Sequence, residues 1–396
     1  MGLLSALAAH DLGYIRTPEL VERLEATMAT LDALERCNGH LFNWYDTTTL
    51  APLSPRYVST VDSGNLAGAL LALAVGLRRL AGEPQAATQI CAGLWDTAEL
   101  ARQSLVRLER TPGVDHEASD RLAAVVGSIL DVLDGPADPP GKLARGAGQV
   151  GALAAAIDAL APSDATAGHH AEAAAWLRSL AAGLAAPAPL PGAFEARLEA
   201  LAARALALAD GMNFAFLYDR ERQIFAIGYR VADAQGPGRL DPSFYDLLAS
   251  EARLASFVAI AKGDVPDSHW FHLGRLLTSV DGAPTLLSWS ASLFEYLMPL
   301  LVMKSYPGTL LDQSCRMAVR RQVEYGRQQG VPWGISESAF SAVDRSFAVT
   351  STARVTWSEH EAKAKFPRGV IISDSAASAP SNDESVEFVE KNANHG

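Results

Sequence analysis

Residues 241–264 read DPSFYDLLASEARLASFVAIAKGD. Apolar side chains recur through this segment at helical spacing, and Glu251 falls on the same apolar stripe. We therefore predict a helix in which Glu251 is buried. Loss of solvent raises the pKa of a carboxyl group, so a buried glutamate can hold a proton near neutral pH and donate it as a general acid. The alternative is a glutamate at the edge of the stripe that reaches solvent or an arginine such as Arg253 or Arg275.

A second glutamate, Glu337, lies in GVPWGISES (330–338), where Gly and Ser leave room for a ligand to approach. Cleavage of a glycosidic bond uses two carboxyl groups in unlike surroundings, because one protonates the leaving oxygen while the other stays ionised as nucleophile or base. Glu251 and Glu337 are candidates for these two roles. Glu337 also fits the first turn of a helix after a Ser cap, where the helix dipole favours a carboxylate.

Longer stretches around both glutamates form a recognisable pattern. They read NFAFLYDRERQIFAIGYRV, LDPSFYDLLASEARLASFVAIAKGDVPDSHWFHLGR, LLSWSASLFEYLMPLLVMKSYPGTLLDQSC and RRQVEYGRQQGVPWGISESAFSAVDR, with GHLFNWYDTTTLAPLSPRYVSTVDSGNLAGALLALA (39–74) upstream. These segments resemble the glucoamylase-like cyclisation domain of bacterial cyclic β-1,2-glucan synthases, over nearly all of residues 1–345. The resemblance implies a mainly α fold, an (α/α)6 barrel in which a ring of helical hairpins has its sugar cleft at one end.

The resemblance also implies a reaction, the retaining transglycosylation of linear β-1,2-glucan into a ring. In the family's pattern the acid/base is the Glu of YDLLASEAR, here Glu251, and the nucleophile is the Glu of GISES, here Glu337. Retention requires the two carboxyl groups to lie about 5 Å apart. If water replaces the acceptor hydroxyl, the same site is a β-1,2-glucan hydrolase.

Sugar-binding residues are expected among aromatic and short polar side chains, because hexose rings present apolar C–H faces and many hydroxyls. The segment 42–65 has this composition and should lie around the same opening as Glu251. Packing of each aromatic ring in the core is the alternative. The predicted substrate-binding residues are Trp44, Tyr45, Asp46, Asp62, Asn65, Tyr245, Trp289, Glu295 and Trp333.

Composition argues against several other classes of protein. The net charge of −12 and the pI near 5.2 disfavour nucleic acid or an anionic membrane as the main partner. Cys37, Cys91 and Cys315 lack metal-site or CxxC spacing, and their odd number favours reduced thiols in a cytoplasmic setting. We expect no metal and no cofactor. The longest apolar runs fall short of the ~20 residues that span a bilayer, so a membrane link is expected only through the full-length inner-membrane enzymes of the family.

Helical periodicity and Pro/Gly breaks predict the order of elements. A β-hairpin is expected from FAFLY (214–218) and QIFAIGYRV (223–231), and an extended piece at 284–290 should lead into a helix over 291–305. The predicted helices cover 1–37, 63–82, 86–110, 115–134, 143–161, 165–185 and 192–211.

The last segment departs from the family's pattern. Residues 346–396 are rich in Ser, Ala and charge, which predicts a divergent, disordered tail or the product of a shifted reading frame. The domain would then be residues 1–345, a C-terminally truncated and incomplete barrel. Three functions stay open on this basis: the cyclising transglycosylase, the hydrolase, and an inactive remnant or carbohydrate-binding helical module.

Overall fold

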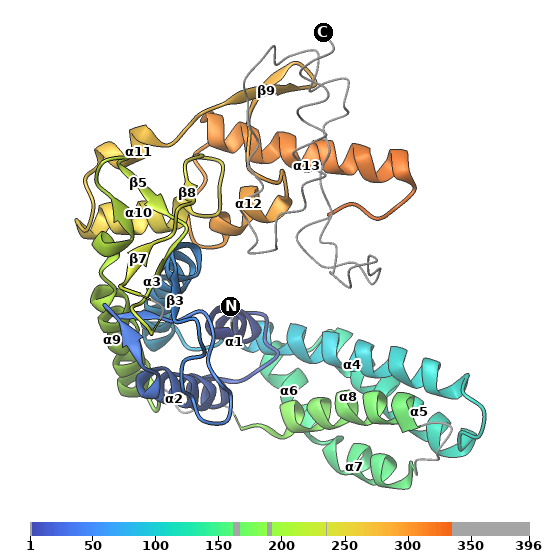
Figure 1. Cartoon of the computed structure of the whole chain (residues 1–396). Helices are drawn as coiled ribbons and strands as arrows, with labels where there is room; N and C mark the ends of the chain where they lie inside the picture. The colour runs from blue at the N-terminus through green and yellow to red at the C-terminus, as the bar shows by residue number, and fades with distance from the viewer. Residues whose placement is uncertain (1, 161–166, 188–191, 235, 335–396) are drawn as a thin grey trace. The chain divides into compact units, whose positions relative to one another are not determined.

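The computed structural model describes residues 2–160, 167–187, 192–234 and 236–334, and the predicted tail lies outside them. The described chain is mainly helical, as predicted, and carries only short strands (Figure 1). It divides into two compact units: residues 1–33 with 69–208 form the first unit, and residues 34–68 with 209–396 the second.

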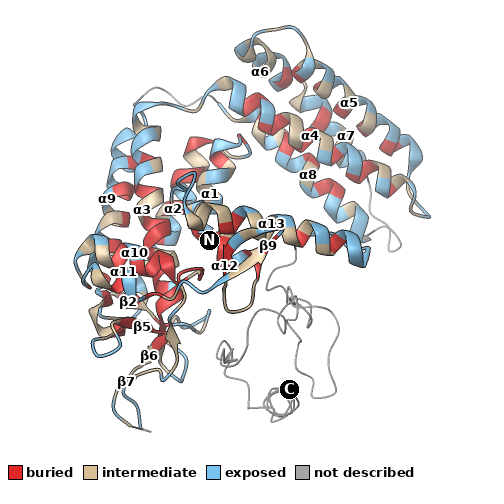
Figure 2. Cartoon of the chain, turned by 90° about the horizontal axis from the view of Figure 1, so that it is seen from above, coloured by how far each residue is buried: buried red, intermediate tan, exposed pale blue. Residues whose placement is uncertain are grey.

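The first unit is entirely helical in its described residues. Its helices are α1 (Gly2–Asp11), α2 (Thr17–Ala33), most of α3 (Thr60–Gly82), α4 (Ala87–Glu109), α5 (His116–Asp134), α6 (Pro139–Ala147), α7 (Val150–Ala159), α8 (Ala167–Ala185) and most of α9 (Glu195–Gly211). Buried residues of α4 and α5, such as Leu105, Leu122 and Ile129, pack with Leu177 of α8 in one apolar core (Figure 2). The predicted helices are confirmed, except that 1–37 and 143–161 each hold two helices rather than one.

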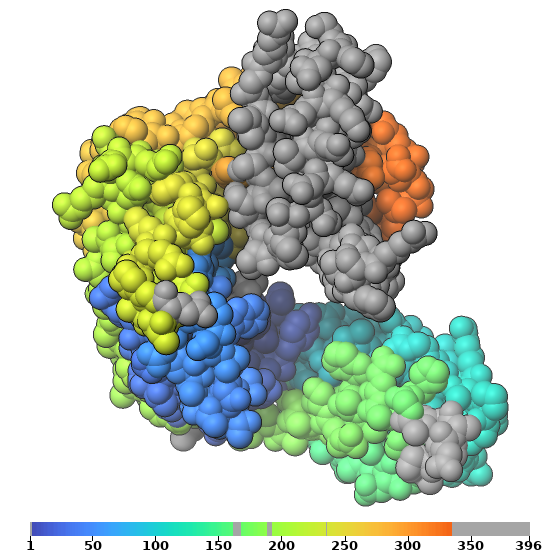
Figure 3. Space-filling view, in the orientation of Figure 1, coloured from blue at the N-terminus to red at the C-terminus, as the bar shows by residue number. Residues whose placement is uncertain are grey.

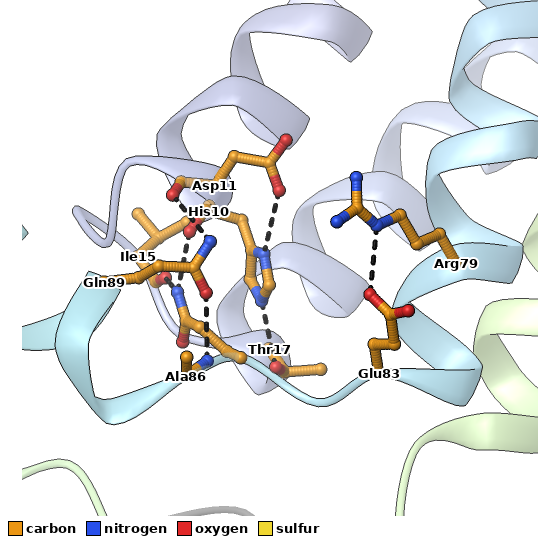
Figure 4. Close-up of polar contacts among 9 residues, drawn as sticks. His10, Asp11, Ile15, Thr17, Arg79, Glu83, Ala86 and Gln89 are labelled. Carbon is orange, nitrogen blue, oxygen red and sulfur yellow. Dashed lines mark hydrogen bonds and ion pairs between the residues drawn. The ribbon is translucent and has the colours of Figure 1, made fainter.

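The break between α1 and α2 has a local cause. Gly13 has a φ of +82°, and a Cβ there would lie 2.0 Å from the Gln89 carbonyl oxygen, so only glycine fits this turn. Gln85 donates to the carbonyls of His10 and Ile15, at 2.7 and 3.0 Å. Figure 4 shows these two residues of the turn beside Ala86 and Gln89. The turn is thereby fastened to the start of α4.

Helices α2 and α9 are joined by two ion pairs of matching register. Arg197 pairs with Glu25 and Arg204 with Asp32, each at 2.6 Å. Both members of the second pair lie seven residues after those of the first, so the two helices run parallel. These pairs are largely exposed, and each contributes only about 0–1 kcal/mol.

The second unit carries the strands. They are β1 (Arg36–Cys37), β2 (His40–Leu41), β3 (Tyr57–Ser59), β4 (Tyr218–Asp219), β5 (Ile224–Ala226), β6 (Gly228–Arg230), β7 (Arg239–Leu240), β8 (Phe244–Tyr245), β9 (Leu277–Val280) and β10 (Ala283–Leu286). Two small antiparallel sheets have the orders β3-β6-β7 and β4-β5-β8, and β1–β2 and β9–β10 are hairpins. Figure 3 shows the blue segment that contains β3 beside the yellow-green segment of β6 and β7.

The predicted hairpin at 214–231 is present but shorter than expected. Residues 214–217 form the 3-10 helix η1 (Phe214–Leu217), and only β4 and β5 pair. The predicted extended piece at 284–290 is confirmed in part by β10, which pairs with the unpredicted β9.

The remaining helices of the second unit are short apart from the last. They are α10 (Arg253–Lys262), α11 (Ser268–His272), α12 (Leu293–Leu297), the 3-10 helix η2 (Met298–Leu301) and α13 (Leu310–Gln329). The helix predicted over 291–305 is therefore wrong in length, because Pro299 removes a backbone donor and the chain tightens into η2. The helix predicted within 241–264 begins only at Arg253, since Phe244 and Tyr245 pair with β5 instead.

Two helical stretches are long and apolar enough to cross a membrane by length and composition, Thr60–Gly82 and Glu195–Leu217. The expectation that the apolar runs are too short to span a bilayer was therefore wrong. Helices of a buried core pass the same test, and 61% of the apolar window in α3 is buried.

Candidate functional site

Two glycines of α3 set how closely α3 approaches α10. A Cβ added to Gly64 would lie 2.5 Å from the Ala255 Cβ, and one added to Gly68 would lie 2.9 Å from a Leu254 methyl group. Side chains cannot approach so closely, so the helices meet because positions 64 and 68 have none. The first turns of α3 thus lie against the start of α10.

Glu251 lies in the turn just before α10 and is half-buried, rather than buried within a helix as predicted. The Asn65 amide nitrogen of α3 donates a short hydrogen bond to Glu251 Oε1, across 186 residues of sequence. Asn65 Oδ1 is buried and has no hydrogen-bond partner among the residues that the structure describes. The structure therefore brings one predicted sugar-binding residue directly onto the predicted acid/base.

Arg253 secures the turn that carries Glu251. The residue is 3% exposed, and its guanidinium donates to the Ser250 carbonyl at 2.9 Å, the Glu295 carbonyl at 2.6 Å and the Tyr296 carbonyl. Burial lowers the pKa of Arg253, while neighbouring groups, Glu251 among them, oppose that change. Of the two arginines considered from the sequence, Arg253 is therefore the one that lies near Glu251.

Arg275, the other candidate, directs its donors elsewhere. Its guanidinium bonds the carbonyls of Leu273 and Trp270 at 2.6 and 2.9 Å.

Glu295 organises the loop that carries Trp289. Glu295 is 6% exposed. Its carboxylate accepts from the Trp289 and Ser290 backbone N–H groups at 3.0 and 2.9 Å, and from the Ser288 and Ser290 hydroxyls at 3.0 and 2.6 Å. It also forms a capping box with Ser292 at the start of α12. Trp289 is half-buried, and no described residue accepts a hydrogen bond from its indole N–H.

A cluster of phenols and carboxylates lies around Tyr57 of β3. The Tyr57 hydroxyl donates to Asp241 Oδ2 at 3.2 Å. The pKa of Tyr57 is raised, first by burial and then by Asp241, Tyr245 and Asp62. Gly228 makes room for this ring, because a Cβ there would lie 2.4 Å from it. Two predicted sugar-binding residues, Asp62 and Tyr245, are thereby grouped.

Tyr57 and Asp241 are not among the residues predicted above. Both lie in segments that carry the family resemblance, and this was the only sign in the sequence of a functional role. Their hydrogen bond joins positions 184 residues apart, so sequence spacing could not show that they pair.

The segment at 44–46 makes local contacts. The Tyr45 hydroxyl donates to the Glu35 carbonyl at 2.7 Å, and burial raises its pKa. Asp46 accepts from the Thr48 and Thr49 N–H groups at 2.9 and 2.6 Å, and bonds of this kind lower its pKa. Trp44 is 68% exposed.

Trp333 is also exposed, and it lies against Gly326 at the end of α13. Glu337 lies outside the described residues. Within the described ranges, no group of three or more His, Cys, Asp or Glu residues is placed to hold a metal ion.

Glu251 is a half-buried carboxyl group that accepts the amide N–H of Asn65 and lies near the charge of Arg253. A carboxyl group positioned in this way can donate or accept a proton. Asp62 lies one turn before Asn65 in α3, so its carboxylate is a second polar group on the same side of that helix.

Comparison with known proteins identifies one related sequence. No family model matches the chain. The chain is 39% identical over 370 residues to the cyclic beta-(1,2)-glucan synthase NdvB of Rhizobium meliloti (strain 1021). The alignment covers 88% of this chain but only 13% of that protein. The resemblance predicted from the sequence is therefore confirmed, for a part of a much longer protein.

Proposed function

We propose that the chain is a cyclisation module that closes linear β-1,2-glucan into a ring by retaining transglycosylation, with residues 1–345 forming an (α/α)6 barrel. Similarity to part of NdvB supports the link to β-1,2-glucan. The observation that carries the proposal is the hydrogen bond between Asn65 and Glu251, because it joins two of the segments that carry the family resemblance and orients a carboxyl group.

In the first step, Glu337 attacks the anomeric carbon of a bound glucose residue. Glu251 protonates the departing 2-hydroxyl oxygen as the glycosidic bond breaks, and a glycosyl-enzyme forms. In the second step, Glu251 removes the proton from the 2-hydroxyl at the other end of the same chain. That oxygen bonds to the anomeric carbon and releases Glu337.

The surrounding groups take the sugar rings. Trp289 and Tyr245 are half-buried rings that suit the C–H faces of glucose, and Asp62 can bond its hydroxyls. Trp44 and Trp333 are exposed and would act at outer positions of a long chain. Tyr45, Asp46 and Glu295 would contribute by holding the loops around these rings.

The substrate is a neutral polysaccharide, and binding it requires no basic surface, which is consistent with the net charge of −12. We place the activity in the cytoplasm, with membrane attachment only through a larger inner-membrane enzyme.

Product mass tests the function. Purified chain would be incubated with linear β-1,2-glucan, with Glu251→Gln as the inactive control. Products that each lack one water relative to linear glucan of the same length support cyclisation. Shorter linear chains would instead identify a hydrolase that uses the same two glutamates. No change in the glucan, with folded protein that still retards it in an affinity gel, would identify a carbohydrate-binding module.

A further inference from the structure

We propose that Asn65 is the positioning residue that determines which oxygen of Glu251 carries the catalytic proton. The inference rests on the proposed function, since it assigns a task within that reaction. Asn65 was predicted from the sequence only as a sugar-binding residue, and its contact in the structure is with the acid/base itself.

The backbone fixes Asn65 at this position. Its neighbour Gly64 packs directly on Ala255 of α10, and Gly68 packs on Leu254 one turn later. Because Glu251 lies four residues before Ala255, the amide and the carboxyl group face each other across this tight contact.

The orientation of the amide follows from the chemistry of its partner. Among the described residues, no donor reaches the buried Asn65 Oδ1, and an unsatisfied buried acceptor is unfavourable. Turning the amide over would set Oδ1 against Oε1, so that two acceptors meet, and would bury the two N–H donors instead. The carboxylate of Glu251 therefore selects the orientation in which Nδ2 donates.

This bond distinguishes the two oxygens of Glu251. A protonated carboxyl group has one carbonyl oxygen and one hydroxyl oxygen, and the amide N–H requires an acceptor at Oε1. The proton is therefore held on Oε2. It passes from Oε2 to the glycosidic oxygen as the C–O bond breaks and Glu337 bonds to carbon. In the second step Oε2 receives the proton of the incoming hydroxyl as the bond to Glu337 breaks. The amide stays on Oε1 throughout.

Among the described residues, the charged groups near Glu251 include Arg253 of α10, which interacts with both Glu251 and Glu295 and binds the Glu295 carbonyl of α12. Substitutions of Asn65 leave Arg253 and Glu295 in place.

Kinetics provide the first test. Asn65→Ala should lower kcat on linear β-1,2-glucan about tenfold to a hundredfold with KM nearly unchanged, because a misdirected acid slows proton transfer. A second substrate would be an aryl β-glycoside of a β-1,2-linked glucose oligosaccharide. The same variant should release its phenol at nearly the wild-type rate when the phenol is a good leaving group, since that step needs no acid. Ser63→Ala, on the same helix, is the control and should behave as wild type.

Three kinetic outcomes are distinct. If Asn65→Ala lost activity equally on both substrates, the role of Asn65 would be merely structural. If only its KM rose, Asn65 would bind sugar. Either result overturns the inference while the proposed function stands. A wild-type protein that neither changes the glucan nor releases the phenol would overturn the proposed function.

Titration of Glu251 tests the hydrogen bond without activity. Carboxyl carbon resonances of ¹³C-glutamate-labelled protein would be followed by NMR against pH, with the Glu251 signal assigned from its loss in Glu251→Gln. Removing a donor from a carboxylate disfavours its ionised form. The midpoint of the Glu251 signal should therefore rise in Asn65→Ala and rise further in Asn65→Asp, where two carboxyl groups share one proton. An unchanged midpoint in both variants would overturn the inference.

Discussion

The guanidinium of Arg253 donates a 2.6 Å hydrogen bond to the carbonyl of Glu295. Pro299 lies four residues after Glu295 and has no N–H, so α12 cannot supply the usual helical donor to that carbonyl. Arg253 supplies it from α10 instead. The turn that carries Glu251 and the loop that carries Trp289 are thereby held by one buried side chain.

Replacing Arg253 should destabilise the second unit strongly. In Arg253→Met the Glu295 carbonyl loses its donor and the buried charge beside Glu251 disappears, so we expect a loss of about 2–4 kcal/mol in the free energy of unfolding. Arg275→Met is the matched control, because Arg275 also bonds two carbonyls but is exposed, and it should cost less than about 1 kcal/mol. Urea denaturation followed by circular dichroism measures both, and equal losses would contradict the role given to Arg253.

Gly64→Ala should separate α3 from α10. The new methyl group would overlap the backbone of Ala255, and overpacking of this kind costs about 1–3 kcal/mol. It should also weaken the bond between Asn65 and Glu251 and lower activity on β-1,2-glucan. The control is Gly127→Ala in α5, where no atom lies within 4 Å of the added Cβ and a gain of about 0.5–1 kcal/mol is expected. Thermal denaturation distinguishes the two, and a stabilised Gly64→Ala would refute the close packing.

The helices were predictable where apolar repeats are long and end at clear breaks. α4 and α5 begin and end within a residue or so of the predicted bounds, and Gly135 follows α5 directly. Around Glu251 the same reasoning failed. Phe244 and Leu247 have helical spacing, but they lie in extended chain, where Phe244 pairs with Ala226 and Leu247 bridges to Gly274. Tertiary pairing there overrides the local pattern.

The candidate site was predictable in its residue types more than in its contacts. The resemblance identified Glu251, and the composition of segment 42–65 identified Asn65, yet nothing local in the sequence could show that they touch. Glu295 was predicted to bind sugar, whereas its carboxylate is occupied by the loop from Ser288 to Ser292. A short polar run before a glutamate fits a capping box as well as a binding loop, so sequence spacing alone could not separate these roles.

The buried histidine His40 should make stability fall in mild acid. His40 is fully buried, its Nε2–H donates to the Asn213 carbonyl at 2.9 Å, and its Nδ1 has no partner within the described part of the chain. Burial lowers its pKa to about 4, with nearby Lys262 and Asp264 acting in opposite directions. The unfolded chain therefore binds the proton first, so the stability from neutral His40 is present above pH 6.5 and is lost as pH falls towards 4.

The size of this effect follows from the two pKa values. A difference between 6.5 and about 4 corresponds to roughly 3 kcal/mol at most. Unfolding free energies measured from pH 7 to pH 4 should show this slope, and His40→Gln should reduce it while lowering stability at pH 7. His272→Gln, at an exposed position, should leave the slope unchanged. An undiminished slope in His40→Gln would assign the acid sensitivity to the other buried histidines, His10 and His269, whose pKa values burial also lowers.

Exchange of the two glutamates for glutamine should separate their roles. Only the nucleophile bonds to carbon, so Glu337→Gln should abolish the glycosyl-enzyme with every substrate. The acid can be bypassed by a leaving group that needs no proton, so Glu251→Gln should still release an acidic phenol from an aryl glycoside and accumulate the intermediate. Mass spectrometry of the intact protein after rapid quenching detects that intermediate as one added glycosyl group. Added azide, which needs no general base, should then restore turnover in Glu251→Gln alone. If Glu337→Gln were instead the variant rescued by the activated substrate, the two roles would be reversed, and the hydrogen bond from Asn65 would orient the nucleophile rather than the acid.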